Sequence, residues 1–146
     1  MGYYVSLRTA HFEVPETETV LSALKELDKH DDLKHGGSFG PNGKTESWFS
    51  WMPKDWDTTC TTVREVFELL GFGTTLVEKP YGVAVSLDVY ESKTGQEDLF
   101  CSTVAPFLEK GSYIEWIGED HAEEAWVVQD GEMKVLVREG NEKWWQ

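Results

Sequence analysis

The stretch Ala125-Trp126-Val127-Val128-Gln129-Asp130-Gly131-Glu132-Met133-Lys134-Val135-Leu136-Val137-Arg138 decides the fold class. Its Asp-Gly dipeptide separates two apolar-rich segments, 125–128 and 134–138, and in this setting Asp-Gly is a strong signal for a tight hairpin turn. Residues 113–117, just upstream, have the composition of a third strand. The C-terminal third of the chain therefore predicts three consecutive strands of a largely antiparallel sheet.

Working outward, the rest of the chain predicts both strands and helices. Apolar runs predict strands at 3–7, 46–52, 74–78 and 83–90, with a turn at 79–82 between the last two. Helical spacing of apolar residues predicts three helices: one beginning at Pro15, one at 59–70 ended by Gly71, and one opened by a capping box at 94–97 and interrupted at Pro106. Residues 36–43 hold four glycines and one proline, which predicts a loop. We expect one α+β domain over residues 1–146, with three helices on a largely antiparallel sheet.

Composition excludes several function classes. The chain has 146 residues, 27 Asp and Glu against 13 Lys and Arg, and a formal net charge of −14. Such a chain is repelled by phosphate backbones and anionic lipid, so neither direct nucleic-acid binding nor a membrane partner is expected. No apolar run is long enough to span a bilayer, and the N-terminus lacks the pattern of a signal peptide. Cys60 and Cys101 have no CxxC spacing, which favours buried, reduced thiols in a cytoplasmic protein.

Matches to catalytic motifs are poor. One partial match is to a phosphate-binding loop, formed by Gly37 and Gly43-Lys44-Thr45. Five residues separate the two glycines, whereas the motif has four, and a strand rather than a helix is expected to follow. The histidines are not spaced as metal ligands on one helical face. We therefore expect no catalytic residue, no metal and no cofactor.

The acidic stretch 111–133 contains no Lys or Arg. Three interpretations stay open for it: a solvated hairpin, a protein-facing acidic patch, or a catalytic or metal site that also uses His121. The candidate binding residues in this stretch are Glu115, Glu119, Asp120, Glu123 and Glu124.

A second candidate surface combines aromatic residues with the glycine-rich loop. The segment 47–53 is dense in aromatic residues, and strict alternation makes both of its faces apolar, as in a central strand covered on both sides. Trp56 follows Pro53 and is expected to be exposed. Exposed aromatic side chains beside a glycine-rich loop form a reasonable binding surface. The candidate residues are Phe39, Lys44, Trp51 and Trp56.

Four phrases together resemble a group of small, poorly characterised proteins encoded by phages and prophages, particularly of actinobacteria. They are Met1-Gly2-Tyr3-Tyr4-Val5, Thr45-Glu46-Ser47-Trp48-Phe49-Ser50-Trp51-Met52-Pro53, Ser92-Lys93-Thr94-Gly95-Gln96-Glu97-Asp98-Leu99-Phe100 and Gly111-Ser112-Tyr113-Ile114-Glu115-Trp116-Ile117-Gly118-Glu119-Asp120. The order of elements is also similar to the layout of small ferredoxin-like phage and plasmid proteins. The resemblance implies an accessory protein that acts in the host cytoplasm, where such proteins interfere with host machinery.

These observations lead to one expected function and several rivals. The leading hypothesis is a non-enzymatic protein that binds and inhibits a host macromolecule, in particular a nucleic-acid-binding defence protein. It would act in the manner of anti-CRISPR or anti-restriction proteins, and its acidic residues would mimic the charge of nucleic-acid phosphates. One rival is a small-molecule or nucleotide-signal sponge that uses the 36–43 loop with Trp51 or Trp56 as a stacking platform. Others are a toxin-immunity protein and an enzyme built on the acidic stretch. Neither the partner nor the oligomeric state follows from the sequence.

Overall fold

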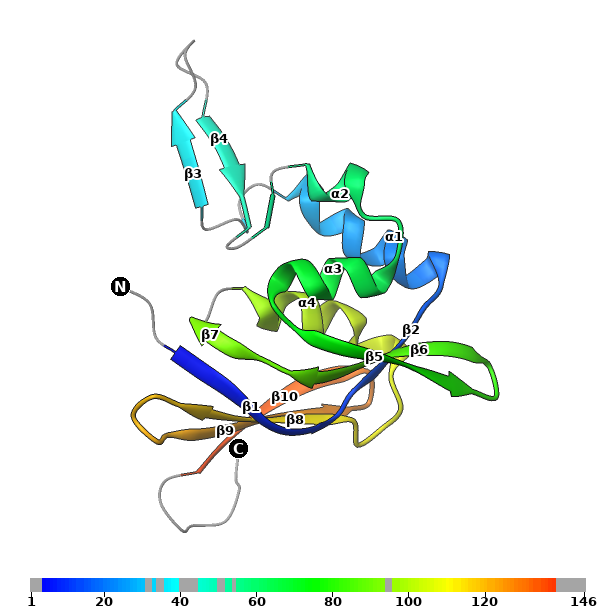
Figure 1. The fold of residues 1–146 in the computed structure, drawn as a ribbon, viewed down its shortest axis with the longest axis vertical. Helices are drawn as coiled ribbons and strands as arrows, with labels where there is room; N and C mark the ends of the chain where they lie inside the picture. The colour runs from blue at the N-terminus through cyan, green and yellow to red at the C-terminus, as the bar shows by residue number, and fades with distance from the viewer. Residues whose placement is uncertain are drawn as a thin grey trace.

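A strongly bent antiparallel sheet is the framework of the fold (Figure 1). The computed structural model describes residues 4–30, 33, 36–39, 45–49, 52–53, 55–93 and 96–138, of which 36–39, 45–48, 93 and 138 are described by backbone alone. Five strands run in the order β10-β9-β8-β1-β7, three in the order β2-β6-β5, and β3 and β4 form a separate hairpin. The strands are β1 (Tyr4–His11), β2 (Glu13–Pro15), β3 (Gly36–Phe39), β4 (Thr45–Trp48), β5 (Gly73–Lys79), β6 (Gly82–Val89), β7 (Glu91–Lys93), β8 (Tyr113–Gly118), β9 (Glu123–Gln129) and β10 (Glu132–Arg138).

The five-stranded and three-stranded sheets are two arms of one bent sheet. β1 and β2 follow each other directly along the chain, as do β6 and β7. Backbone hydrogen bonds cross the bend from Leu7 N to Tyr90 O at 2.8 Å and from Leu87 N to Phe12 O at 3.0 Å. Phe12 and Tyr90 are both buried at this point. The bend therefore lets one side of the sheet curve around the core.

The helices gather on one side of this sheet (Figure 1). They are α1 (Glu18–Glu26), α2 (Trp56–Thr59), α3 (Val63–Leu70) and α4 (Glu97–Val104), with 3₁₀ turns η1 (Leu27–Lys29) and η3 (Ala105–Phe107). This confirms the predicted α+β class with an antiparallel sheet. Among the described residues, no helix is long and apolar enough to cross a membrane.

Local signals explain where α3 begins and ends. The Thr62 hydroxyl accepts a hydrogen bond from Glu65 N at 3.1 Å, and the Glu65 carboxylate accepts one from Thr62 N at 3.0 Å. This capping box starts the helix at Val63, so the predicted continuous helix over 59–70 is wrong: Cys60, in extended conformation, separates α2 from α3. The predicted stop at Gly71 is confirmed, because that residue has φ +116° and closes a Schellman motif.

Two other helix starts also differ from the prediction. Pro15 pairs with Ala84 as the last residue of β2, and the side chain of Thr17 caps α1 instead. α4 begins at Glu97 with Gln96 at its N-cap, later than the predicted capping box requires. The predicted early end at Pro106 is confirmed, since α4 passes into η3 there.

The segment around the glycine-rich loop is organised differently from the prediction. Gly36–Phe39 is strand β3, paired antiparallel with β4, so half of the expected loop is extended. β4 ends at Trp48 and belongs to a two-stranded hairpin, so the predicted central strand over 46–52 is wrong. Phe49, just beyond β4, is fully buried and anchors the end of this hairpin in the core.

Aromatic side chains make up much of the core. Phe49, Trp56 and Phe100 form one edge-to-face cluster between the helices. A second chain of ring contacts links Phe67, Phe72, Tyr90, Trp116 and Trp126 from α3 to the five-stranded sheet. Such contacts add to the stabilisation that burial of the rings supplies.

Candidate functional site

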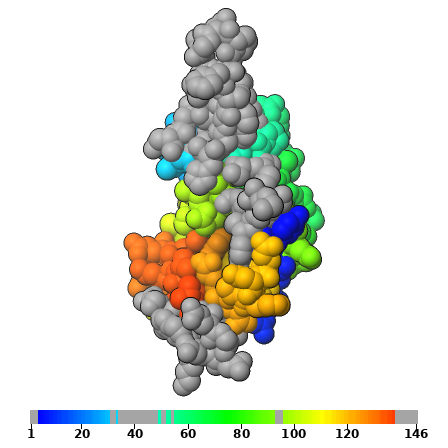
Figure 2. All heavy atoms as spheres, turned by 90° about the vertical axis from the view of Figure 1, so that its left-hand side faces the viewer, coloured from blue at the N-terminus to red at the C-terminus, as the bar shows by residue number. Residues whose placement is uncertain are grey.

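An open groove of about 400 Å³ lies at one end of the five-stranded sheet, and we call it the acidic groove. Three segments meet there: the beginning of β1, the beginning of β7, and the turn between β8 and β9. Figure 2 shows residues of the β8–β9 turn beside the first residues of β1. The groove is lined by Tyr4, Ser6, Glu91, Ile117, Gly118, Glu119 and His121.

Strand pairing places these residues together. Ser6 of β1 pairs with Glu91 on one side and with Ile117 on the other. At the mouth of the groove, Glu119 N donates to Tyr4 O at 3.0 Å, and Tyr4 N donates to the Glu119 carboxylate at 3.3 Å. The Tyr4 side chain is 49% exposed. A carboxylate and an aromatic ring are thus both presented to solvent at the same end of the sheet.

The β8–β9 turn has a defined backbone. Gly118 N donates to Ala122 O at 2.8 Å, and His121 N donates to Gly118 O at 2.9 Å. The Asp120 carboxylate accepts from Ala122 N at 3.1 Å, an Asx-type turn that holds the tip of the hairpin. His121 has φ +67°, a left-handed conformation that histidine tolerates better than most residues. Part of the acidity at this tip therefore has a structural role.

The charge of the acidic groove favours a cationic ligand. Glu91, Glu119 and Asp120 are exposed, and the backbone of Lys93 pairs with that of Tyr4 at the same end of the sheet. The lining suits a lysine or arginine side chain, with carboxylates for the charge and the Tyr4 ring for the alkyl stem or guanidinium plane. Within the described part of the chain, no three His, Cys, Asp or Glu residues are arranged to hold a metal ion.

The predicted acidic residues do not form one patch. Glu115 and Glu123 lie on the sheet face opposite to Trp116, and Glu123 is ion-paired with Arg8. Glu124 lies on the same face as Trp116, toward the helices. Only Glu119 of the predicted set lines the acidic groove, and Asp120 lies next to it at the tip.

One residue of the predicted aromatic surface, Trp56, is not at the surface of the molecule. Trp56 is 1% exposed, packs against Phe49 and Phe100, and donates from Nε1 to Asp28 Oδ1 at 3.0 Å, so the expectation that it is exposed is wrong. The short helix α2 turns the Trp56 ring inward, and a helix of only four residues is too short to leave a periodic pattern in the sequence. Phe39 is placed by its backbone in β3, and Lys44 and Trp51 lie outside the described residues.

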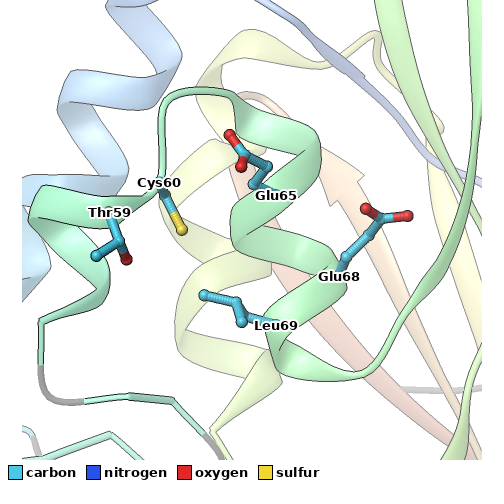
Figure 3. Close-up of a pocket in the computed structure, with 5 residues that line it drawn as sticks. All are labelled: Thr59, Cys60, Glu65, Glu68 and Leu69. Carbon is cyan, nitrogen blue, oxygen red and sulfur yellow. The ribbon is translucent and has the colours of Figure 1, made fainter.

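A second hollow, of about 350 Å³, lies between α2 and α3 (Figure 3). Its polar groups are already engaged: Glu65 accepts hydrogen bonds from Thr61 and Thr62, and Glu68 lies 3.5 Å from Arg64 in an ion pair. Burial, with help from the nearby Glu65 charge, raises the pKa of the Cys60 thiol. A protonated thiol is a poor nucleophile. The hollow therefore has the features of helix capping rather than of a reactive site.

A buried polar cluster lies between α4 and the sheet. Glu97 and Tyr90 are buried, and they are hydrogen-bonded to each other. Burial, and then the adjacent Glu97 charge, raises the pKa of Tyr90 far above its ordinary value. Glu97 also lines a cavity of about 40 Å³ with Trp116, whose Nε1 has no hydrogen-bond partner among the described residues. The cavity has room for a few waters, which suits a structural role.

Cys101 belongs to the same region and is fully buried. Burial raises its pKa well above the ordinary value. Both cysteines are free and buried, as expected from the sequence.

Comparisons with known proteins add no relative to this description. No family model matches the chain, and neither a curated protein nor a solved structure matches it.

Sequence reasoning missed most of the acidic groove. Tyr4 and Glu119 are 115 positions apart, and Glu91 comes from a third segment. The acidic stretch 111–133 was a usable signal for Glu119, but nothing local marks Tyr4 or Glu91 as its neighbours. The Thr62-x-x-Glu65 capping box, in contrast, was visible in the sequence and would have corrected the start of α3.

Proposed function

We propose that this chain is a non-enzymatic binding protein that holds a basic macromolecule through the acidic groove. The observation that carries the proposal is the groove itself: exposed Glu91 and Glu119 lie beside a half-exposed Tyr4. A net charge of −14 adds long-range attraction for a basic partner and raises the association rate.

The partner class follows from this charge. A cleft that binds nucleic acid is lined with Lys and Arg, and the acidic groove offers carboxylates to such side chains. Combined with the resemblance to phage accessory proteins, this leads us to propose inhibition of a nucleic-acid-binding host defence protein, in the anti-CRISPR or anti-restriction manner and in the host cytoplasm. A lysine or arginine from the cleft would enter the groove, where nucleic-acid phosphate would otherwise compete for it.

The experiment measures binding of the purified chain to a panel of defence nucleases by biolayer interferometry. The test variant is Glu91→Gln with Glu119→Gln, which removes the groove's two carboxylates. The matched control is Glu78→Gln with Asp130→Asn, which removes two exposed carboxylates from other hairpins. Because an exposed ion pair contributes about 0.2–1 kcal/mol, the groove variant should lose affinity by roughly tenfold and the control by far less.

Salt and nuclease activity complete the test. Binding should weaken between about 0.1 M and 1 M salt, where the screening length falls from about 10 Å to 3 Å. A bound nuclease should also lose activity on its nucleic acid. Binding to no member of the panel, or equal losses in the groove and control variants, would refute the proposal.

A further inference from the structure

Among the strands that the structure describes, β10 has a neighbour on one side and none on the other. It ends the five-stranded sheet, with β9 as its sheet neighbour. Val135 and Val137 are 47% and 46% exposed, although their register partners Trp126 and Glu124 lie on the sheet face that is turned toward the helices. Figure 2 shows β10 along one margin of the molecule. An edge strand of seven residues, four of them apolar, is a template for pairing with another strand.

The backbone groups that β10 offers can be assigned from the ladder. In β9, Val128 N donates to Ser112 O and Val128 O accepts from Gly111 N, so Val128 faces away from β10. Successive residues of a strand face alternate edges, so Val127 and Gln129 face β10, where their register partners are Lys134 and Glu132. The N–H and C=O groups of the intervening residues, Met133, Val135 and Val137, therefore point to the open edge.

The sequence of β10 is complementary to itself in one antiparallel register. When two copies of the strand are centred on Val135, that residue lies opposite its own equivalent, and Met133 lies opposite Val137. The same register sets position 132 of each copy, which is acidic, opposite position 138 of the other, which is basic. Within one chain, Glu132 is ion-paired with Lys134 at 3.2 Å. The residues that become hydrogen-bonded pairs are those whose backbone groups point outward.

We propose that two copies of this chain associate through β10 as a two-fold symmetric dimer with one sheet running through both. The pairing covers the half-exposed valines and satisfies the outward backbone groups of both copies. β10 carries one acidic and two basic residues in a chain of net charge −14, so it brings two acidic molecules together at a locally basic segment. A two-fold interface closes on itself, which ends assembly at the dimer.

The first test is sedimentation equilibrium of the purified chain from low micromolar to submillimolar concentration. The wild type is expected to reach dimer mass and to stop there. Val135→Lys, which sets two ammonium groups opposite each other on the two-fold axis, should raise the dimer dissociation constant by up to about fivefold. Leu76→Lys is the matched control, because Leu76 is 48% exposed on edge strand β5; it should dimerise as the wild type does.

The second test checks the register by exchanging charges. Glu132→Arg alone places two basic residues opposite each other at both ends, and Arg138→Glu alone places two acidic residues there. Each variant alone should dimerise more weakly, whereas an equimolar mixture of the two restores opposite charges at both ends and should form heterodimers. Thermal unfolding by circular dichroism checks that each variant is folded, because position 138 is the register partner of Glu123 in β9.

Four results would overturn the proposal. The first three are a wild type that stays monomeric at the highest concentration, assemblies larger than a dimer, and a mixture of the charge variants that sediments like its separate components. Equal effects of Val135→Lys and Leu76→Lys would place the interface elsewhere and would overturn it too.

Discussion

Replacement of Trp56 tests whether the aromatic cluster between the helices is core or binding surface. Its side chain is 1% exposed, its ring centroid is 6.4 Å from that of Phe49 and 5.5 Å from that of Phe100, and its Nε1 donates to Asp28 at 3.0 Å. Trp56→Ala removes all three interactions at once.

The size of the effect follows from these contacts. A buried tryptophan replaced by alanine loses about 3–5 kcal/mol, the sum of lost transfer free energy and the cavity left behind. Trp56→Phe keeps an aromatic ring against Phe49 and Phe100 but loses the bond to Asp28, so about 1–3 kcal/mol is expected. Asp28→Asn keeps the acceptor oxygen and should lose less than about 1 kcal/mol.

The assay is urea unfolding followed by far-ultraviolet circular dichroism, which does not depend on tryptophan emission. Tyr81→Ala is the control, because Tyr81 is an exposed aromatic residue in the β5–β6 turn and its loss should change the free energy of unfolding by less than about 0.5 kcal/mol. A Trp56→Ala protein within about 1 kcal/mol of the wild type would refute the assignment of Trp56 to the core.

Two further predictions concern helix α3. Gly71→Ala should lower the free energy of unfolding in urea by about 1–3 kcal/mol, because Gly71 has φ +116° and an added Cβ lies 3.1 Å from the Tyr90 ring. Gly82→Ala is the control, because Gly82 has φ +131° with open space around it, and its loss should be smaller. Equal losses in the two variants would contradict a clash with Tyr90. Hydrogen bonds from Thr61 and Thr62 hold the pKa of Glu65 below its ordinary value of 4.5, so its contribution to stability is present above that pH and is lost as the pH falls through the lowered pKa. Glu65→Gln should flatten this acid-side loss in thermal melts, and an unchanged pH profile would contradict it.

The parts of the fold that were predictable depend on residues close in sequence. Asp130 and Gly131 both have positive φ, 54° and 75°, as the hairpin signal requires. The apolar residues in 63–70 recur at helical spacing, and these same residues form the buried face of α3. In each case the determining interactions lie within one turn or one hairpin, so sequence patterns carry them.

The parts that were not predictable depend on distant partners. The bend at Phe12 and Tyr90 exists because β1 pairs with β7 while β2, which follows β1 directly, pairs with β6, and neither segment reveals this pairing alone. The acidic groove has the same origin, since β1 lies between β7 and β8. Trp56 was misjudged for a related reason: its burial depends on Phe100, Phe49 and Asp28, from three other segments.

The uneven distribution of charge makes the two proposed interactions respond in opposite ways to salt. Binding of a basic partner in the acidic groove draws on attraction between unlike charges, so salt should weaken it. Pairing of two chains through β10 works against repulsion between molecules of net charge −14, so screening that repulsion should strengthen the pairing. The two surfaces lie in different places, because the groove is built on β1, β7 and the β8–β9 turn, and β10 is the far edge of the same sheet. Partner binding and dimerisation, measured over one series of salt concentrations, therefore separate the two interactions. If salt weakened both or strengthened both, one of the two surfaces would be wrongly assigned.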